Sequence, residues 1–384
     1  MIVFNMASTQ PDIHSGKRHG GGIYGEIVFK QLLRKTKQVI ALYDDKKWIN
    51  PEIVEVCHEN GVTVLSNRGM TFEKLMKDYG CRLFYSPVPN CFLPDFETTH
   101  CPIIMTIHGL RDFELPLDWY ELLYKKSLRQ MAKFWKKVLI DRWNTHSAKL
   151  QQAQMLTRDN LKFVTISNHS KYSFGAVFPM IDYQRIQVFA SPSTLTWTMC
   201  DRELDAEKEP FFLLVSGNRW EKNNLRAIMA LDRLMCEGKL NGYRVVVTGV
   251  QEDGYYYRIK NKELFEFLGY VDDQELNELY KRAYCFVYPT LNEGFGYPPL
   301  EAMHAGTPVL ASAFSSVSEV CADAVIYFNP FSILEIQNRL LMILNEKVYH
   351  EYQNRGYRQF DIIKRKQDED LDLLVEYIIK EAGV

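Results

Sequence analysis

The chain has 384 residues, a length at which a single hydrophobic core usually gives way to two or three domains. Its 46% hydrophobic and 24% charged residues are ordinary for a folded protein and argue against extensive disorder. The formal net charge of −2 gives no sign of the basic surface that nucleic-acid-binding proteins carry.

The cysteines and the N-terminal sequence bear on the compartment. Eight cysteines are scattered singly, with no CxxC pair and no metal-ligand spacing, which is typical of free thiols in a reducing environment. The N-terminal stretch MIVFNMASTQPD lacks the features of a signal peptide, and no run of 18 apolar residues could span a membrane. We therefore expect a cytoplasmic protein without a bound metal.

Short apolar runs alternate with helical patterns through the first half of the chain. The run at 1–6 is followed by a polar, glycine-rich segment and a helical pattern at 26–35, which is the order of a strand–loop–helix unit. Further strand candidates lie at 39–44, 62–66, 82–87, 102–109 and 163–168. This alternation predicts a mostly parallel sheet with helices on its faces.

A polar stretch at 191–210 interrupts the pattern and is interpreted as a linker. The series then restarts. Strands are expected at 211–215, 243–250, 265–271, 284–290, 308–312 and 324–330, with helices at 225–238 and 272–283 and a helical tail from 332. The fold class predicted is α/β, with Rossmann-like domains at 1–196 and 197–356 and a terminal helix at 357–384.

The stretch NEGFGYPPLEAMHAGTPVLAS, at 292–312, carries the strongest signal of a site. The preceding strand should end near Thr290, and ligands of open α/β sheets bind beyond the carboxyl ends of strands. Gly294 and Gly296 let the backbone approach a ligand closely, while Pro298 and Pro299 suit the first turn of a helix. The N-terminus of that helix would favour an anion such as phosphate.

Two glutamates flank this turn. Glu293, on what we expect to be an exposed turn, and Glu301, early in the helix, can both face the same cleft. A carboxylate there can accept hydrogen bonds from the vicinal hydroxyls of a sugar. For either residue alone a structural role is an adequate alternative: Glu301 would complement the helix dipole and Glu293 would lie on a solvated turn. Together with the glycines and prolines, the pair favours a nucleotide-sugar site.

These residues resemble the E-x7-E signature of a large bacterial family of retaining, GT-B fold glycosyltransferases, the glycosyl transferases group 1, which are mannosyl- and glucosyltransferase-like. The resemblance continues through 215–224, 267–290 and 318–330 and so covers nearly all of the second half. It is looser in the first half, at 19–25, 106–112 and 164–171. It implies two Rossmann-like domains that face a central cleft, the first on the acceptor side and the second binding the donor, with the terminal helix crossing back to the first.

The resemblance also implies roles for the motif. Glu301 would hold the ribose hydroxyls of the donor nucleotide, and Glu293 would bind hydroxyls of the transferred sugar. Backbone amides of the intervening turn would line the sugar and the phosphates, from Gly294, Phe295, Gly296 and Tyr297.

Arg219 and Lys222 would grip the diphosphate, again by resemblance. Two fixed cations stabilise the charge that develops on the leaving group and can replace a divalent metal. The chain departs from the family here, because only two residues separate the arginine from the lysine, which puts Arg219 in more doubt than Lys222. The alternative is a charged helix start on the surface.

In the loop 267–276, the backbone at Val271 and the side chain of Asp273 lie where the family reads the base. An aspartate can accept hydrogen bonds from guanine that uracil cannot donate, which favours GDP. The alternative is a helix start, in which Asp272 and Glu275 form a capping box and Asp273 suits the first turn.

The first half would supply the other wall of the cleft. Gly20, Gly21 and Gly22 follow a strand and precede a helix, so their backbone can approach a diphosphate, although a glycine run is weak evidence. His108 follows an apolar strand and by resemblance would contact the transferred sugar or orient the acceptor, with Asp112 a further candidate in the same loop. A structural histidine is the alternative.

The segment 125–149 has eight Lys or Arg residues against one Asp. At helical spacing Leu128, Met131, Trp135, Leu139 and Arg142 share one face, and basic residues gather on the other: Lys126, Arg129, Lys133, Lys136 and Lys137. Helices of this type can lie on anionic lipid. The alternative, a solvated outer face on a packed helix, is the commoner explanation.

The resemblance thus implies a retaining, metal-independent hexosyltransferase of polysaccharide biosynthesis that needs no cofactor. Its partners would be a GDP- or UDP-linked donor, with GDP-mannose favoured, and a saccharide or lipid-linked saccharide acceptor. The alternatives are a nucleotide-sugar epimerase of the same fold and a non-catalytic sugar-binding scaffold. A nicotinamide dehydrogenase is disfavoured because the chain has no GxGxxG after a strand with a suitably spaced acid.

Overall fold

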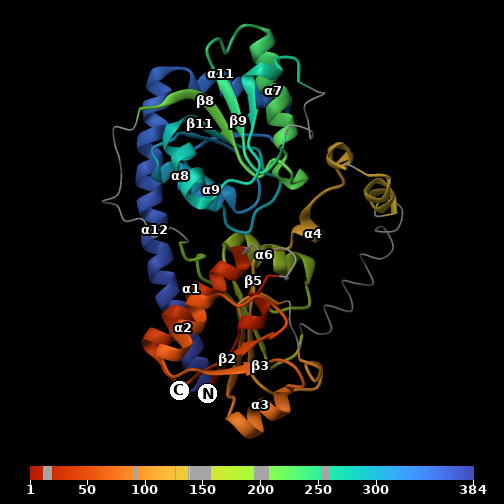
Figure 1. Ribbon diagram of the computed structural model, residues 1–384, viewed down its shortest axis with the longest axis vertical. Coiled ribbons are helices and arrows are strands. Elements are labelled where there is room, and N and C mark those ends of the chain that lie inside the picture. The colour runs from red at the N-terminus through yellow and green to blue at the C-terminus, as the bar shows by residue number, and fades with distance from the viewer. Residues whose placement is uncertain are drawn as a thin grey trace. The chain divides into compact units, whose positions relative to one another are not determined.

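The computed structural model describes residues 1–11, 20–89, 93–125, 127–136, 138, 157–193, 207–251 and 259–384. The chain forms two compact units (Figure 1). The first comprises Met1–Leu110, Thr145–Thr194 and Arg365–Val384, and the second comprises Arg111–Asn144 and Leu195–Lys364. These units differ from the predicted ranges in two respects: the segment after Leu110 belongs to the second unit, and the chain returns to the first unit at Arg365, not at 357.

The first unit is built on a parallel sheet. Among its described residues the strand order is β3-β2-β1-β4-β5-β6-β7, and all pairs are parallel. The strands are β1 (Ile2–Asn5), β2 (Val39–Tyr43), β3 (Thr63–Ser66), β4 (Leu83–Ser86), β5 (Ile103–Ile107), β6 (Leu161–Thr165) and β7 (Ile186–Val188). The helices are α1 (Gly20–Lys35), α2 (Pro51–Glu59), α3 (Phe72–Tyr79) and α6 (Asn168–Val177), with 3-10 turns η1 (Met6–Ser8) and η3 (Tyr183–Arg185).

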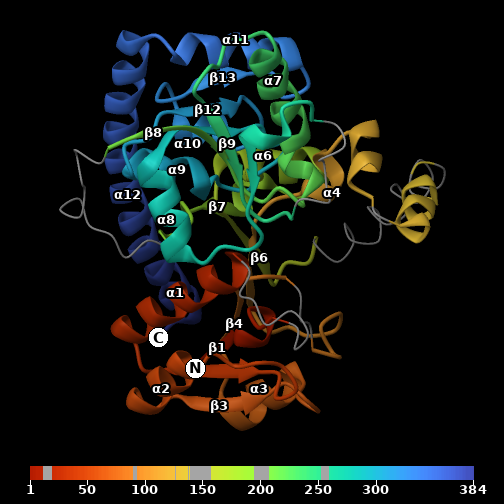
Figure 2. The same cartoon turned by 45° about the horizontal axis from the view of Figure 1, so that its top comes forward.

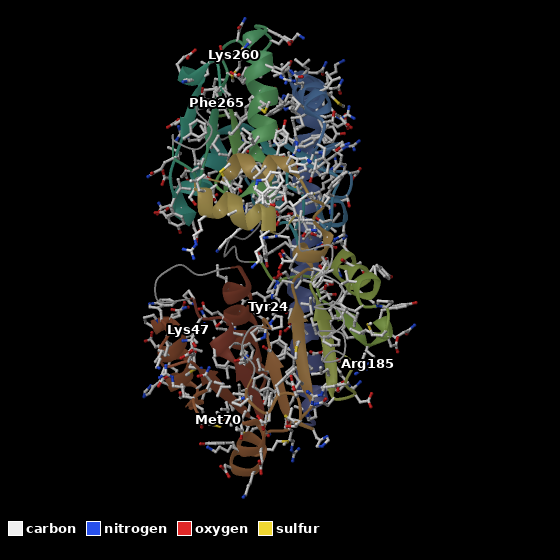
Figure 3. The ribbon with its side chains drawn as sticks, turned by 90° about the vertical axis from the view of Figure 1, so that its right-hand side faces the viewer. Tyr24, Lys47, Met70, Arg185, Lys260 and Phe265 are labelled. Atoms are coloured by element: carbon white, nitrogen blue, oxygen red, sulfur yellow. The ribbon has the colours of Figure 1, made fainter. Side chains whose placement is uncertain are left out.

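Burial explains why these sequences form strands. Every residue of β1, β2, β4 and β5 is buried, as expected for parallel strands covered on both faces. The helices that follow begin at capping side chains: Asn50, Thr71 and Ser167 each accept a hydrogen bond from a backbone N–H of the first turn. In α1, Tyr24 (Figure 3) is buried and its ring meets that of His108 edge-on at 4.7 Å.

The second unit repeats the architecture. Its described strands run in the order β10-β9-β8-β11-β12-β13, again all parallel. They are β8 (Glu209–Leu214), β9 (Arg244–Val247), β10 (Phe265–Phe267), β11 (Ala283–Tyr288), β12 (Val309–Ser312) and β13 (Ile326–Phe328). The helices are α7 (Asn224–Cys236), α8 (Asp273–Arg282), α9 (Tyr297–His304), α10 (Val317–Cys321) and α11 (Ile333–Ile343), with 3-10 turns η5 (Trp220–Lys222) and η7 (Lys262–Leu264).

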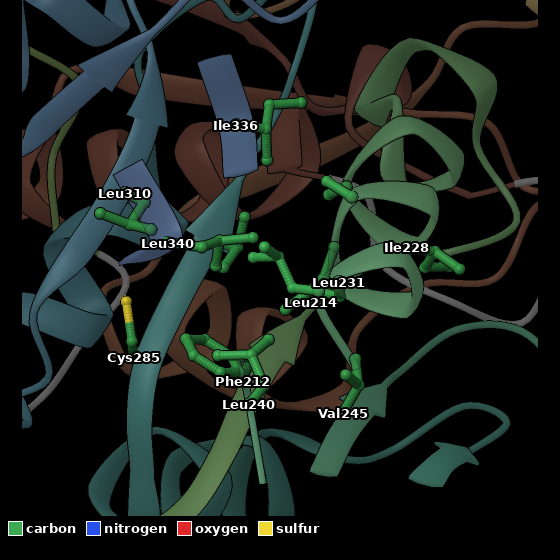
Figure 4. Packing of buried hydrophobic residues seen from close by; sticks show 14 of the residues in the cluster. Phe212, Leu214, Ile228, Leu231, Leu240, Val245, Cys285, Leu310, Ile336 and Leu340 are labelled. Carbon is green, nitrogen blue, oxygen red and sulfur yellow. The ribbon is translucent and has the colours of Figure 1, made fainter. Parts of the chain in front are cut away.

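The core of this unit lies between the sheet and the helices α7 and α11. Ile228 and Leu231 of α7 and Leu340 of α11 pack with buried residues of the strands (Figure 4). The helices α8 and α9 lie side by side away from this cluster (Figure 2). The fold class is therefore the predicted α/β class, with two Rossmann-like units.

The helix α12 (Glu346–Ala382) contributes to both units and begins earlier than the predicted terminal helix. Its N-terminal half packs on the second unit, where Gln359 donates to the Val320 carbonyl at 2.8 Å. Gly306, at φ 68°, follows α9, and a side chain there would overlap the Tyr357 hydroxyl. Its C-terminal half belongs to the first unit, where the Asp370 carboxylate accepts from the Ala190 N–H at 2.7 Å. No described helix is long and apolar enough to cross a membrane.

Each sheet has one place where the strand order reverses. In the second sheet it lies between β8 and β11, which pair with each other and whose following helices cover opposite faces. Ligands of open α/β sheets bind beyond the carboxyl ends of the strands at such a point. The loops after β8 and β11 are therefore where the fold leads us to look for a site.

The segment after β5 is attached to the second unit by a buried ion pair. It forms α4 (Arg111–Glu114) and the 3-10 turn η2 (Trp119–Tyr124). The Asp118 carboxylate accepts two hydrogen bonds from Arg226 of α7, at 2.7 and 2.8 Å, and both side chains are 7% exposed. The Tyr120 ring stacks on the same guanidinium at 3.7 Å. These contacts explain why 111–125 groups with the second unit although it follows the first unit's β5 in sequence.

Asp118→Ala should destabilise the second unit. The substitution leaves the buried Arg226 guanidinium without its carboxylate partner, with the Asn223 side-chain oxygen still accepting one hydrogen bond from it. Removing one partner of a buried pair costs about 3–5 kcal/mol. Denaturant unfolding would measure the loss. The control is Asp118→Leu combined with Arg226→Met, which should lose less than the sum of the single variants. A loss below about 1 kcal/mol for Asp118→Ala would contradict the assignment.

Candidate active site

A buried ion pair joins the loops that follow β8 and β11. Lys222 Nζ lies 2.6 Å from Glu293 Oε1, and the two side chains are 7% and 11% exposed. Lys222 also donates to the Tyr288 hydroxyl at 3.1 Å, and the Thr290 hydroxyl donates to Glu293 Oε1 at 2.7 Å. The expectation that Glu293 sits on an exposed turn is wrong, because these partners enclose it.

The environment decides the charge of this pair. Burial alone would raise the pKa of Glu293, but the Lys222 ammonium and the hydrogen bonds hold that pKa below its usual value. Burial lowers the pKa of Lys222, and the neighbouring Arg219 and Arg111 lower it further, while Glu293 opposes this. The pair therefore forms part of a larger group of charges.

Glu221 links that group to two arginines. Its Oε1 accepts from Arg219 Nη2 at 2.7 Å and from Arg111 Nη1 at 3.2 Å. Burial opposes ionisation, yet the two guanidinium groups lower the pKa of Glu221. Arg219 is thus near Lys222, as predicted, but its guanidinium is bound to Glu221. Sequence reasoning assigned no role to Glu221 or Arg111, although both lie in stretches that resemble the family, at 215–224 and 106–112.

Two serines brace the turn between the glutamates. The Ser315 hydroxyl accepts from the Glu293 N–H at 2.8 Å. The Ser316 hydroxyl donates to the carbonyl oxygens of Glu293, at 2.9 Å, and Phe295, at 2.8 Å. These contacts fix the backbone of the predicted Gly294–Tyr297 turn. Sequence reasoning missed these serines, because a hydroxyl that follows the next strand, β12, gives no local signal.

The helix α9 carries Glu301. It begins at Tyr297 after Gly296, whose φ of 117° favours glycine, and Pro298 and Pro299 lie in its first turn as predicted. Although Glu301 keeps some exposed surface, it lies deep among protein atoms, and this desolvation raises its pKa to about 7. The nearby Tyr280 hydroxyl lowers the pKa of Glu301, although the two groups do not form a hydrogen bond of normal geometry. The Asp273 carboxylate raises that pKa, because two negative charges repel each other.

The predicted base-reading residues lie at the start of α8. Asp272 caps the helix, with its carboxylate accepting from the Glu275 N–H at 2.8 Å, so the capping alternative holds for this residue. Asp273 is the first residue of the helix and is exposed, and Val271 lies just before it, half-buried. The electrostatic effect of Asp273 on Glu301 puts the two carboxylates in one neighbourhood.

The candidates in the first unit have different surroundings. Gly20, Gly21 and Gly22 form the first turn of α1 and do not precede it, which corrects that detail of the expectation. The His108 Nε2 atom lies 2.8 Å from the Pro87 carbonyl oxygen, so in the neutral ring the proton is on Nε2. Asp112 lies in α4, is exposed, and belongs to the second unit, apart from the unit of His108.

The predicted basic helix is described only in part. Residues 128–136 are helical, whereas Lys126, Lys137 and 139–149 lie outside the described residues. Three members of the predicted apolar face are exposed: Leu128 by 85%, Met131 by 38% and Trp135 by 46%. Contact with a membrane stays a prediction. The described cysteines are free thiols, and no cluster of metal-ligating residues occurs in the described part of the chain.

The two parallel sheets, and a charged site at the point where the second reverses, define the chain as a protein of the GT-B glycosyltransferase fold. Residues 198–359 match the family described as Glycosyl transferases group 1. The predicted site residues from Arg219 to Glu301 all lie within this range.

The chain is also similar in sequence to O-antigen mannosyltransferases and in fold to a solved structure that binds UDP-glucose. The O-antigen chain mannosyltransferase RfbU of Salmonella typhimurium is 26% identical over 56% of this chain and 67% of its own length. The O-antigen chain mannosyltransferase B of Escherichia coli is 32% identical over 36% of this chain and 38% of its own length, so the aligned part is well under half of that relative. Anabaena Alr3699/HepE, solved in complex with UDP-glucose, has a TM-score of 0.63 at 12% identity and covers 99% of both chains.

The raised pKa of Glu301 predicts a pH-dependent stability. The folded protein holds this proton up to about pH 7, whereas the unfolded chain releases it near 4.5, so the folded state loses stability as pH rises between those values, by at most about 3 kcal/mol. Glu301→Gln cannot ionise and lacks this loss. Unfolding free energies should be measured for both proteins at about pH 5 and about pH 8. The stability of the variant relative to the wild type should be greater at the higher pH. A difference between the two proteins that does not change with pH would contradict the prediction.

Proposed function

We propose that the protein is a hexosyltransferase that takes its sugar from a nucleoside diphosphate donor, with mannose from GDP-mannose as the favoured case. The observation that carries the proposal is the arrangement of Lys222, Glu293 and Glu301 around the reversal point of the second sheet, inside the Glycosyl transferases group 1 domain. The preference for mannose rests on the mannosyltransferases among the similar proteins.

Each group in the site suits one part of such a donor. A carboxylate at Glu301 can accept hydrogen bonds from two ribose hydroxyls. Glu293, held as an anion by Lys222, can do the same for hydroxyls of the sugar. Cations beside them stabilise the diphosphate as negative charge builds up on it during bond cleavage. In the first unit, Gly21 and Gly22 would approach the diphosphate, and His108 would contact the sugar or orient the acceptor.

The proposed mechanism proceeds with retention and without a metal. No pair of groups in the described site is arranged as a nucleophile with its base, so a front-face route is proposed, in which a departing phosphate oxygen accepts the acceptor's proton. Such a route depends on positioning and on charge stabilisation. A product with inverted anomeric configuration, or activity abolished by a chelator and restored by a divalent cation, would count against it. The proposed acceptor is a saccharide or a lipid-linked saccharide.

Donor binding is the first test. Thermal unfolding of the wild type would be followed with GDP-mannose, GDP-fucose, UDP-glucose, UDP-galactose, UDP-N-acetylglucosamine, GDP, UDP and NAD. A ligand at a hundred times its dissociation constant adds about 2.7 kcal/mol to the folded state. We expect one nucleotide series to stabilise the wild type and to fail with Glu301→Ala.

Two comparisons make this test specific. Glu335→Ala, which changes a partly exposed glutamate of α11, should keep the nucleotide response of the wild type. Stabilisation by the guanine series alone would support a role for Asp273 in reading the base, and by the uridine series alone would remove that role. If no nucleotide stabilises the wild type, the donor-binding proposal fails and the scaffold alternative gains.

A further inference from the structure

Arg111 occupies an unexpected position in the charged group. It precedes Glu221 by 110 positions in the sequence, yet its Nη1 lies 3.2 Å from Glu221 Oε1, the atom that also binds Arg219. Its side chain is 36% exposed, whereas its Nε atom is buried and has no hydrogen-bond partner among the described residues. Arg111 thus reaches the loop after β8 with a donor still unused.

The charges around this loop are unequal. In the ion pairs at this loop three cations, Arg111, Arg219 and Lys222, share two carboxylates, those of Glu221 and Glu293. The two arginines each disfavour the charged form of Lys222, which means that all three cations act on one small region. A bound anion would relieve this repulsion, and an arginine can present two parallel N–H groups to a phosphate.

The segment that carries Arg111 is held on the second unit at several points. The buried Asp118–Arg226 pair anchors it, and the Tyr124 hydroxyl accepts from the Leu225 N–H at 2.9 Å. Nearer to the site, Glu114 accepts from the Asn292 side-chain amide at 2.6 Å, next to Glu293. Arg111 and Glu114 therefore bring one short helix, α4, onto the loops after both β8 and β11.

We propose that Arg111 is a third phosphate-binding cation of the donor site, positioned by Glu221 beside Arg219 and Lys222. The inference rests on the proposed function, because it assigns Arg111 to the diphosphate of the same donor. Its guanidinium would exchange part of its contact with Glu221 for a phosphate oxygen, while Glu221 keeps Arg219 and Arg111 from repelling each other. The anchor at Asp118 would act through this placement and touch no ligand.

The test compares Arg111→Met with the wild type in equilibrium titrations of the full chain. Two probes are used: GDP or UDP, whichever the wild type binds, and the matching nucleoside, which has no phosphate. Loss of one charge-assisted contact should weaken binding of the diphosphate about 10- to 100-fold and leave nucleoside binding within about 3-fold. Arg111→Lys, which keeps the charge but not the paired N–H groups, should fall between the two.

Arg244→Met is the matched control. Arg244, on β9, has the same side-chain exposure as Arg111, 36%, and is likewise paired with carboxylates, those of Glu209 and Glu266. The variant should bind both probes as the wild type does. Equal affinities of wild type and Arg111→Met for the diphosphate would overturn the inference, as would an equal loss for both probes. If Arg111→Met does not fold, the same comparison of diphosphate and nucleoside affinities is made with Arg111→Lys. Equal diphosphate affinities of that variant and the wild type would then overturn the inference. A wild type that binds neither GDP nor UDP would overturn the proposed function itself.

Discussion

The ion pair between Lys222 and Glu293 is the contact on which the candidate site depends. It connects the loops that leave the two central strands of the second sheet, β8 and β11, and it is almost fully buried. Burying two charges is costly unless their remaining donors and acceptors are satisfied. Here Tyr288 and Thr290 supply those partners, and both come from β11 or the residues just after it. The end of one strand therefore sets the geometry of both loops.

The two glutamates of the motif have opposite environments although eight positions separate them. Glu293 has a lysine at hydrogen-bond distance, and its pKa is lowered. Glu301 has no cation as close among its described neighbours and faces Asp273, and its pKa is raised to about 7. Two carboxyl groups with different charge states at neutral pH are suited to different tasks. Near neutrality Glu301 is the one whose charge a bound partner can change.

Much of the fold could be predicted because its signals are local. Strands buried on both faces read as continuous apolar runs, and all the runs named in the first half overlap strands. The run at 163–168 is the least accurate, because β6 spans Leu161–Thr165. The strand β7 was missed because it has only three residues, and Gln187 in its middle is exposed. The start of α12 was placed too late because no proline or glycine marks it. The motif at 292–312 indicated which loop to examine, since its glycines and prolines have local conformational meaning.

The contacts within the site could not be predicted in the same way. Lys222 and Glu293 lie 71 positions apart, and Arg111 lies 110 positions from Glu221, so no spacing in the sequence joins them. That Glu293 is buried follows from partners on another loop, not from its neighbours in the chain. The role of Ser315 and Ser316 likewise depends on the approach of two loops that the sheet brings together.

The helix α12 has a consequence for how the protein is made. The first unit needs Arg365–Val384, which contact its α1 and β6 through ion pairs such as Lys35–Glu376 and Lys162–Glu381. These residues leave the ribosome only after the whole of the second unit has been synthesised. Domains tend to fold as they emerge. The first unit is therefore completed only after the second unit has been synthesised. Until then, the surface of the first unit that Arg365–Val384 covers stays exposed.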